Sequence, residues 1–202
     1  LLLGMAIAVI TGCSINSSAI SPDKSSASST YHYSLSVLLR LDGQVAEATA
    51  ELEKAIDADP DSVYLKTELV SLYAEKGELP KAVTLGEEIL SVDPDNSDLH
   101  LIMGGLYLNV SEYQKAIKEY KTVIALEPAS EIAHLYLATI YAEEKEYDKA
   151  EKIFVELLKL DPDNVMGIYY YGKVLAEMDR FDEAAEMFKK AIFIRPYFES
   201  AV

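Results

Sequence analysis

The side chains of this chain that could do chemistry are few, and three histidines stand out because their spacing is regular. His32, His100 and His134 differ in number by multiples of 34, so they share one position of a repeating unit. Histidine rings bind metal ions, but equivalent positions of stacked helical units lie on the order of 10 Å apart, too far for two rings to share one ion. We therefore expect a structural role for these histidines and no metal site.

Other signatures of catalysis are missing from the sequence. It has no glycine-rich phosphate loop, no cluster of cysteines and no nucleophile motif. The numerous acidic side chains are interpreted as solvated faces of helices. The sequence thus predicts no catalytic residue, no cofactor and no metal, and a protein that is not an enzyme within these residues.

Cys13 is the only cysteine, and it follows an apolar run that is too short to cross a bilayer as a helix. The residues Ile10-Thr11-Gly12-Cys13 resemble the bacterial lipobox, in which the cysteine sulfur receives a diacylglycerol before cleavage on its N-terminal side. The resemblance implies that residues 1–13 are a lipoprotein signal segment, clipped at its N-terminus, and that lipidated Cys13 anchors the protein to a membrane. The alternative is an incidental buried cysteine.

Composition changes after this segment. Residues 14–30 are rich in serine and contain few large apolar side chains, so they are predicted to be a flexible tether, because they cannot offset the entropy of ordering. The whole chain carries 18 Lys and Arg against 34 Asp and Glu, a net charge of -16. That charge repels phosphates and argues against nucleic acid as a partner.

A column of prolines divides the rest of the chain into units of equal length. The prolines are 34 residues apart, and a column of alanines keeps the same interval twelve residues earlier. The prolines are Pro60, Pro94, Pro128, Pro162 and Pro196, and the alanines are Ala48, Ala82, Ala116, Ala150 and Ala184. The domain of residues 31–198 therefore holds five repeats, at 29–62, 63–96, 97–130, 131–164 and 165–198.

Each repeat carries two apolar stripes with the spacing of helix faces. Positions four, seven, eight and eleven form the i, i+3, i+4, i+7 pattern of a first helix, as in His134, Leu137, Ala138 and Tyr141. A second stripe follows, as in Tyr147, Ala150, Phe154, Leu157 and Leu158. A residue before proline is steered away from the helical region, so the second helix should end there. The expected fold is all-α, a solenoid of five helix-turn-helix repeats.

The second repeat departs from the others in its packing positions. Val70 stands where the other repeats have a small residue, and Gly86 stands where an aromatic residue is usual. We expect a volume exchange in which the methyl groups of Val70 fill the space that Gly86 leaves.

The period of 34 residues, with its alanine and proline columns, resembles the tetratricopeptide repeat (TPR). The resemblance implies a right-handed solenoid that binds a segment of another protein in a concave groove, although the tryptophan usual at position four is absent throughout. With its lipobox, the chain resembles the TPR lipoproteins of bacterial envelopes. Some of those are assembly factors for pili or outer-membrane complexes, and others accompany exopolysaccharide export.

In this family, positions two, five, nine and twelve of the first helix line the groove. Here they are largely apolar and aromatic, which is typical of an interface. The candidate groove residues are Tyr33, Tyr64, Thr67, Leu101, Leu108, Ile132, Leu135, Thr139, Met166, Tyr169 and Lys173. We expect an extended or helical partner segment with apolar anchors. The alternative is that some of these side chains pack between adjacent first helices.

The resemblance also implies a location and a function. Ser14 follows the candidate lipidated cysteine, whereas aspartate there is the usual inner-membrane retention signal in enteric-type bacteria, so the periplasmic face of the outer membrane is expected. The expected function is a non-catalytic, lipid-anchored interaction scaffold. The alternative is the substrate-recruiting arm of an enzyme whose catalytic domain lies beyond Val202. A cytoplasmic co-chaperone would need a clamp of Lys and Asn that the groove positions do not supply.

The last residues suggest a continuation of the solenoid. Residues 199–202 have the pattern of the first turn of a sixth repeat. Without that repeat, the outer face of the last helix, with Phe188, Ile192 and Phe193, has no cover. We expect this end to be weak or to self-associate.

Overall fold

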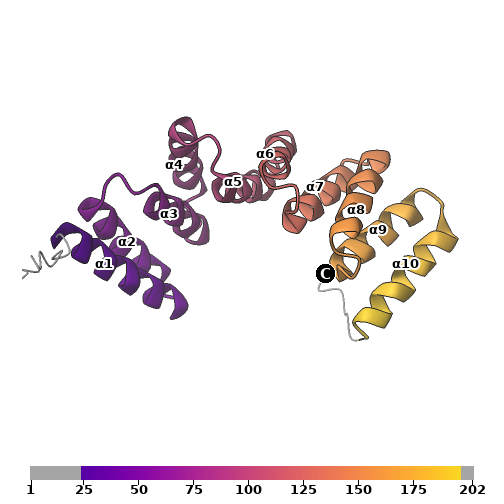
Figure 1. Cartoon of the computed structure of the whole chain (residues 1–202), viewed down its shortest axis with the longest axis horizontal. Helices are drawn as coiled ribbons and strands as arrows, with labels where there is room; N and C mark the ends of the chain where they lie inside the picture. The colour runs from indigo at the N-terminus through magenta and orange to yellow at the C-terminus, as the bar shows by residue number, and fades with distance from the viewer. Residues whose placement is uncertain (1–23, 197–202) are drawn as a thin grey trace, which may run out of the picture.

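The structure, a computed structural model, describes residues 24–196, which form ten α-helices in five consecutive pairs (Figure 1). The first helices of the pairs are α1 (Lys24–Leu41), α3 (Val63–Glu75), α5 (Ser97–Asn109), α7 (Glu131–Glu143) and α9 (Val165–Glu177). The second helices are α2 (Val45–Ala58), α4 (Leu79–Val92), α6 (Tyr113–Leu126), α8 (Tyr147–Leu160) and α10 (Phe181–Ile194). The expected all-α solenoid of five repeats is confirmed. Residues 1–23, with the signal segment and Cys13, and residues 197–202 lie outside the described residues.

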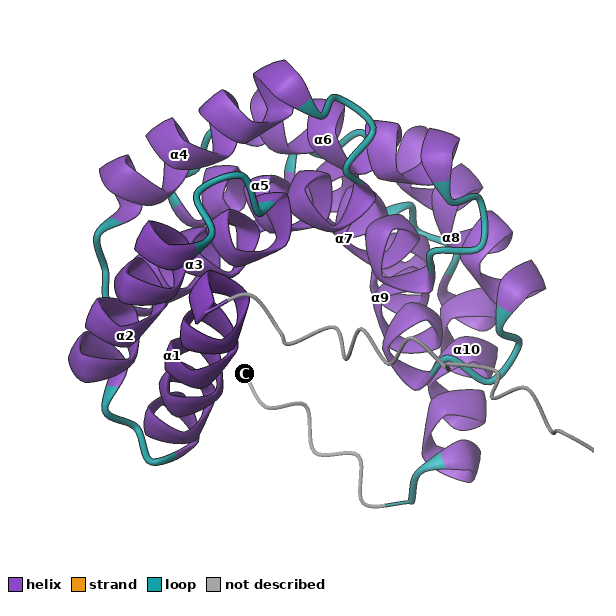
Figure 2. Cartoon of the chain, turned by 60° about the vertical axis from the view of Figure 1, so that its left-hand side comes forward, coloured by secondary structure: helices purple, strands orange, loops and turns teal. Residues whose placement is uncertain are grey.

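The helices are arranged as an arc. The first helix of every pair lies on the inner, concave side, and the second lies on the outer side (Figure 2). Each second helix from α2 to α8 packs most extensively on its partner within the repeat, and then on the first helix of the next repeat. The alanine column supports this close packing, because Ala48, Ala82, Ala116 and Ala150 are completely buried.

Local chemistry sets the helix ends. Each second helix from α2 to α8 ends two residues before the repeat's proline, as expected from the restriction that proline places on its neighbour. Three of the first helices then begin with a side-chain cap. Ser62, Asn96 and Asn164 accept hydrogen bonds from the backbone N–H groups of Leu65, Leu99 and Gly167.

The turn inside each repeat needs a left-handed residue. Positive φ angles of 59–82° occur at five positions that are 34 residues apart: Gly43, Gly77, Ser111, Lys145 and Asp179. Glycine adopts this conformation without steric cost, whereas the other three residue types are strained there. The turn geometry is therefore shared by all five repeats although the residue type is not.

The first helix begins earlier than expected. Lys24 opens α1, so the segment from Lys24 to Thr30, which the composition assigned to the tether, is helical. The hydroxyl of Thr30 donates to the carbonyl of Ser26 (2.9 Å), and Ser34 does the same to Thr30 (2.8 Å). Such bonds to the preceding turn satisfy polar side chains within a helix, which is how a serine-rich stretch can extend one.

The expected exchange between Val70 and Gly86 takes a different form. A Cβ atom added at Gly86 would lie 2.3 Å from the sulfur of Met103. The space left by this glycine is therefore filled by a side chain of the next repeat's first helix, and Val70 is not among its nearest neighbours. Methionine suits this role because its unbranched side chain adapts to irregular gaps.

The outer face of α10 carries exposed apolar side chains, namely Phe181, Ile192 and Phe193, of which Phe193 is 87% exposed. Phe188 does not belong to this face. It is half-buried, and its ring lies 5.8 Å from that of Tyr169 on α9. Self-association through the other side chains remains a prediction.

Candidate functional site

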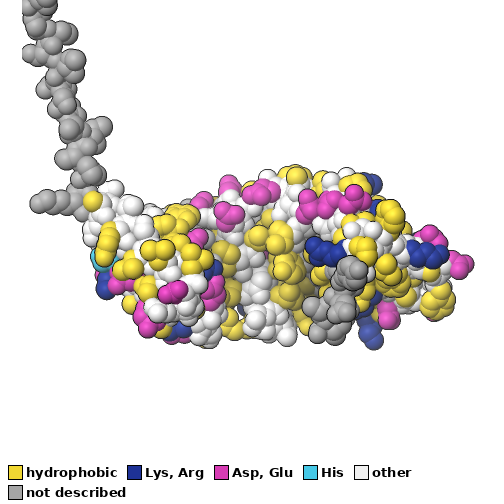
Figure 3. Space-filling model, turned by 90° about the horizontal axis from the view of Figure 1, so that it is seen from below, with side chains coloured by type: hydrophobic (Ala, Val, Ile, Leu, Met, Phe, Trp, Pro, Cys, Tyr) yellow, Lys and Arg dark blue, Asp and Glu magenta, His cyan; other side chains and the backbone are white. Residues whose placement is uncertain are grey.

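The concave face of the arc is built by the sides of the first helices that the repeat cores do not use. Seen from below, hydrophobic side chains follow the middle of this hollowed face, and acidic side chains lie mostly toward its margins (Figure 3). Neighbouring first helices also contact each other, α3 with α5 and α7 with α9. First helices of successive repeats therefore adjoin along part of the groove.

Most of the residues that the sequence assigns to the groove are accessible there. Tyr64, Ile132, Met166 and Lys173 are exposed. The half-buried members are Tyr33, Leu101, Leu108, Leu135, Thr139 and Tyr169. A strip of partly covered apolar side chains thus runs along the first helices.

Thr67 is the exception. Its side chain is only 8% exposed, and its hydroxyl has no hydrogen-bond partner among the described residues. Thr67 is therefore much less accessible to a partner than the other candidate groove residues.

Position six of each repeat also faces the groove. The groove positions expected from the sequence were two, five, nine and twelve, and they did not include it. Ile102 and Tyr136 line one hollow of the groove, and Tyr170 lines another. The signal was present in the sequence, because position six lies four residues after position two and three before position nine, on the same side of the helix. Tyr136 and Tyr170 add aromatic surface to the candidate site, and Ile102 adds aliphatic surface.

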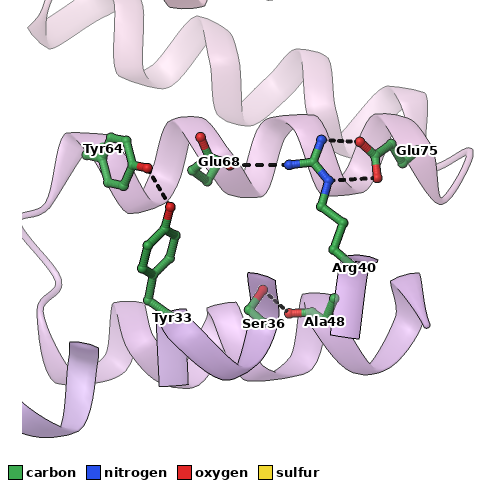
Figure 4. A network of polar contacts seen from close by, with 7 residues as sticks. All are labelled: Tyr33, Ser36, Arg40, Ala48, Tyr64, Glu68 and Glu75. Carbon is green, nitrogen blue, oxygen red and sulfur yellow. Dashed lines mark hydrogen bonds and ion pairs between the residues drawn. The ribbon is translucent and has the colours of Figure 1, made fainter. Parts of the chain in front are cut away.

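The N-terminal end of the groove is polar. Arg40 of α1 reaches across to α3, where its guanidinium pairs with Glu75 and, at 3.4 Å, with Glu68 (Figure 4). The bond to Glu75 raises the pKa of Arg40. Nearby, the hydroxyls of Tyr33 and Tyr64 share a hydrogen bond of 2.5 Å, which raises the pKa of Tyr33 to about 12. These groups already have partners, so this end offers few free anchors.

The C-terminal part of the groove carries a cation beside aromatic rings. The ammonium of Lys173 lies 6.0 Å from the ring centre of Tyr169 and 5.5 Å from that of Tyr170, within reach of a cation–π attraction. It borders a hollow of about 290 Å³ between α7 and α9. The walls also include Glu143 and Glu177, so this hollow offers both signs of charge.

The repeats match a known family over most of the chain. Tetratricopeptide repeat profiles match residues 39–106 and 107–166, and another matches residues 146–197. The chain belongs to the tetratricopeptide repeat family. TPR arrays are interaction scaffolds that present an extended concave surface, and the groove described above is that surface.

Solved structures share the TPR fold. MamA 41-end from Desulfovibrio magneticus RS-1 has a TM-score of 0.77 at 20% identity, covering 86% of this chain and 98% of that one. YrrB has a TM-score of 0.68 at 22% identity, covering 83% and 86%. TTC0263 from Thermus thermophilus has a TM-score of 0.64 at 20% identity, covering 84% and 93%. No curated protein sequence matches the chain.

The histidines of this TPR chain are held inside the repeats. His32 pairs with Glu51 (2.7 Å), His100 pairs with Glu119 (2.5 Å), and the ring of His134 bonds the carbonyl of Ser130 (2.8 Å). These contacts agree with the expected structural role. In residues 24–196, no group of three or more His, Cys, Asp or Glu side chains could hold a metal ion. No helix of that part is long and apolar enough to cross a membrane.

Proposed function

We propose that this TPR chain is a non-catalytic scaffold that binds a segment of another protein along its concave groove. The observation that carries the proposal is the strip of accessible apolar side chains on successive first helices, from Leu101 through Leu135 to Tyr169. On a protein with a net charge of -16, a contiguous apolar strip marks an interface better than scattered single residues do.

The shape of the groove favours an extended or helical segment. Side chains at equivalent positions recur from one repeat to the next, so a linear partner can place one anchor on each repeat. YrrB, a TPR protein with a peptide-binding site, supports a peptide segment as the partner. The polar N-terminal end and the acidic margins favour basic residues at the ends of that segment.

Truncating two central anchors should weaken this binding. We expect Leu135→Ala combined with Tyr169→Ala to cost at least about 1–2 kcal/mol of binding free energy for a partner identified by crosslinking. Isothermal titration calorimetry would measure the change. The control is Leu126→Ala with Leu160→Ala, two exposed apolar residues (37% and 43%) on second helices, outside the groove. Unchanged affinity in a well-folded groove variant would show that the partner binds elsewhere.

We further propose that the scaffold is attached to a bacterial membrane through a lipid on Cys13, on the periplasmic face of the outer membrane. The support is the lipobox-like Ile10-Thr11-Gly12-Cys13 and Ser14 after it. In this proposal the chain assists the assembly of an envelope complex, a pilus or an exopolysaccharide exporter. The serine-rich residues before α1 would let the groove stand away from the membrane.

Lipidation can be tested with a clickable fatty acid fed to cells that express the natural gene. We expect the wild-type protein to be labelled and to sediment with membranes. Cys13→Ala should lose the label, because that sulfur is the acceptor, whereas Ser14→Ala should keep it. Equal labelling of the wild type and Cys13→Ala would contradict the anchor and leave the groove proposal untouched.

A further inference from the structure

A hollow opens on the concave face between α5 and α7. Its volume is about 430 Å³, and its apolar lining consists of Leu101, Ile102, Gly105, Leu108, Tyr120 and Tyr136. Asn109 stands at its edge. Tyr120 belongs to α6, a second helix that lies behind the groove. The hollow therefore extends past the first helices to a side chain of the second layer.

Two consecutive glycines create this depth, and only one of them is required by packing. A Cβ atom at Gly104 would lie 2.8 Å from the ring of Tyr120, so a larger residue cannot be accommodated there. At Gly105 the nearest atom to an added Cβ would be the hydroxyl oxygen of Tyr120, at 3.9 Å. A glycine inside a helix is unfavourable relative to alanine, and no close contact within the described fold explains Gly105.

Tyr120 has a polar group that the fold does not use. Its side chain is 1% exposed, yet its hydroxyl has no hydrogen bond to any residue in the described range 24–196, and it lies beside Gly105 at the floor of the hollow. The equivalent residues of the next two repeats are Phe154 and Phe188, so packing is satisfied without the hydroxyl. Burial raises the pKa of Tyr120, which keeps the phenol a neutral donor.

The aromatic and acidic side chains around the hollow determine which ligand it can bind. The rings of Tyr120 and Tyr136 are stacked at 5.4 Å with an interplanar angle of 20°, and Tyr136 is 39% exposed, so it offers a flat face to an incoming ring. Exposed carboxylates lie at both ends of the hollow's helices, with Asp98 and Glu131 at their beginnings and Glu143 at the end of α7. Charge complementarity therefore calls for cations on both sides of the inserted group.

Resting on the proposed groove function, we infer that this hollow is a specificity pocket for one aromatic side chain of a basic partner segment. The ring lies against Tyr136 and the leucines, and the hydroxyl of Tyr120 donates a hydrogen bond to a backbone carbonyl of the segment. Lysine or arginine residues on both sides of the anchor face Asp98 and Glu143.

The probe is the blocked heptapeptide KAAFAAK, titrated at low salt while the methyl signals of the protein are followed by NMR. We expect shifts of the Leu101 and Leu108 methyl signals with a dissociation constant on the order of 1 mM, typical of a ligand with one anchor. The peptide KAAAAAK, which lacks the ring, should bind at least about tenfold more weakly. EAAFAAE should also bind more weakly, because its charges meet carboxylates.

Two variants address the pocket itself. Gly105→Leu should fill the hollow and weaken KAAFAAK at least about tenfold. It should keep the melting temperature, because the nearest atom to an added Cβ is the Tyr120 hydroxyl oxygen at 3.9 Å, so the new side chain starts without a clash. Tyr120→Phe keeps the ring and should weaken the peptide by about threefold to tenfold, as expected for one lost hydrogen bond. Its melting temperature should not fall, since the hydroxyl has no partner within the described fold.

Shifts confined to Leu135 and its neighbours, or unchanged affinity in Gly105→Leu, would overturn the pocket while the groove proposal stands. The absence of shifts at Leu101 and Leu108 up to about 10 mM peptide would also overturn it. The groove proposal has its own test, which is the affinity of the Leu135→Ala and Tyr169→Ala double variant for the crosslinked partner. The pocket and the groove can therefore be contradicted independently of each other.

Discussion

Phe154→Ala should lower the free energy of unfolding by about 3–5 kcal/mol, the usual cost of emptying a buried aromatic site. Phe154 of α8 is completely buried, and its ring stacks on Tyr171 of α9 at 6.1 Å. It therefore supports both its own repeat and the contact with the next. Because a solenoid is held together by neighbouring repeats, the loss should spread to the C-terminal repeats. Urea denaturation followed by circular dichroism would measure it.

The matched control for this variant is Phe193→Ala on α10. Phe193 is the same residue type on another second helix but is 87% exposed, so its truncation should change stability by no more than about 0.5 kcal/mol. Similar losses in the two variants would show that Phe154 is not the core residue that its burial indicates.

Glu119→Ala should also be costly, by about 1–3 kcal/mol, because it leaves a buried ring nitrogen of His100 without its hydrogen-bond partner. His100 and Glu119 have side chains that are 11% and 9% exposed. The other ring nitrogen of His100 faces the carbonyl oxygen of Pro94 at 2.9 Å. Glu119 and the carbonyl of Pro94 thus satisfy both ring nitrogens of His100, and removing Glu119 leaves one of them without its partner inside the fold. Thermal and urea unfolding at neutral pH would measure the loss.

The first repeat provides a control with the same geometry in a wetter setting. His32 and Glu51 occupy the equivalent positions, but their side chains are 25% and 16% exposed. Glu51→Ala should therefore cost clearly less stability than Glu119→Ala, because solvent screens the more exposed pair. Glu119→Gln, which keeps an acceptor beside His100, should recover part of the stability. Equal losses for Glu119→Ala and Glu51→Ala would contradict a dominant effect of burial.

Much of the fold follows from local sequence. The proline and alanine columns predicted the number of repeats and the ends of the second helices, because proline restricts the residue before it whatever the tertiary context. The same arithmetic placed Leu135 and Tyr169 on the concave face, since the side of a helix on which a residue lies depends only on the helical period. Composition was a poorer guide at Lys24, where side-chain bonds to the backbone extend α1 into the serine-rich segment.

The accessibility of the groove residues needed the structure. Thr67 occupies a groove position by period, yet its side chain is only 8% exposed. Tyr136 was not assigned to the groove, yet it walls its largest hollow among those described. How far side chains of neighbouring first helices cover one another depends on the spacing and curvature of the arc, and a single repeat contains no information about either.

The sequence by itself determined the repeat, its two helices and the side of each helix that faces the core, because these properties arise within about 34 residues. Only the tertiary structure decided which side chain fills each gap between repeats. Met103 occupies the space at Gly86, and Tyr120 lies behind Gly105 with an unused hydroxyl. Such contacts depend on the distance and angle between helices that are far apart in sequence, and close packing makes them sensitive to every methyl group.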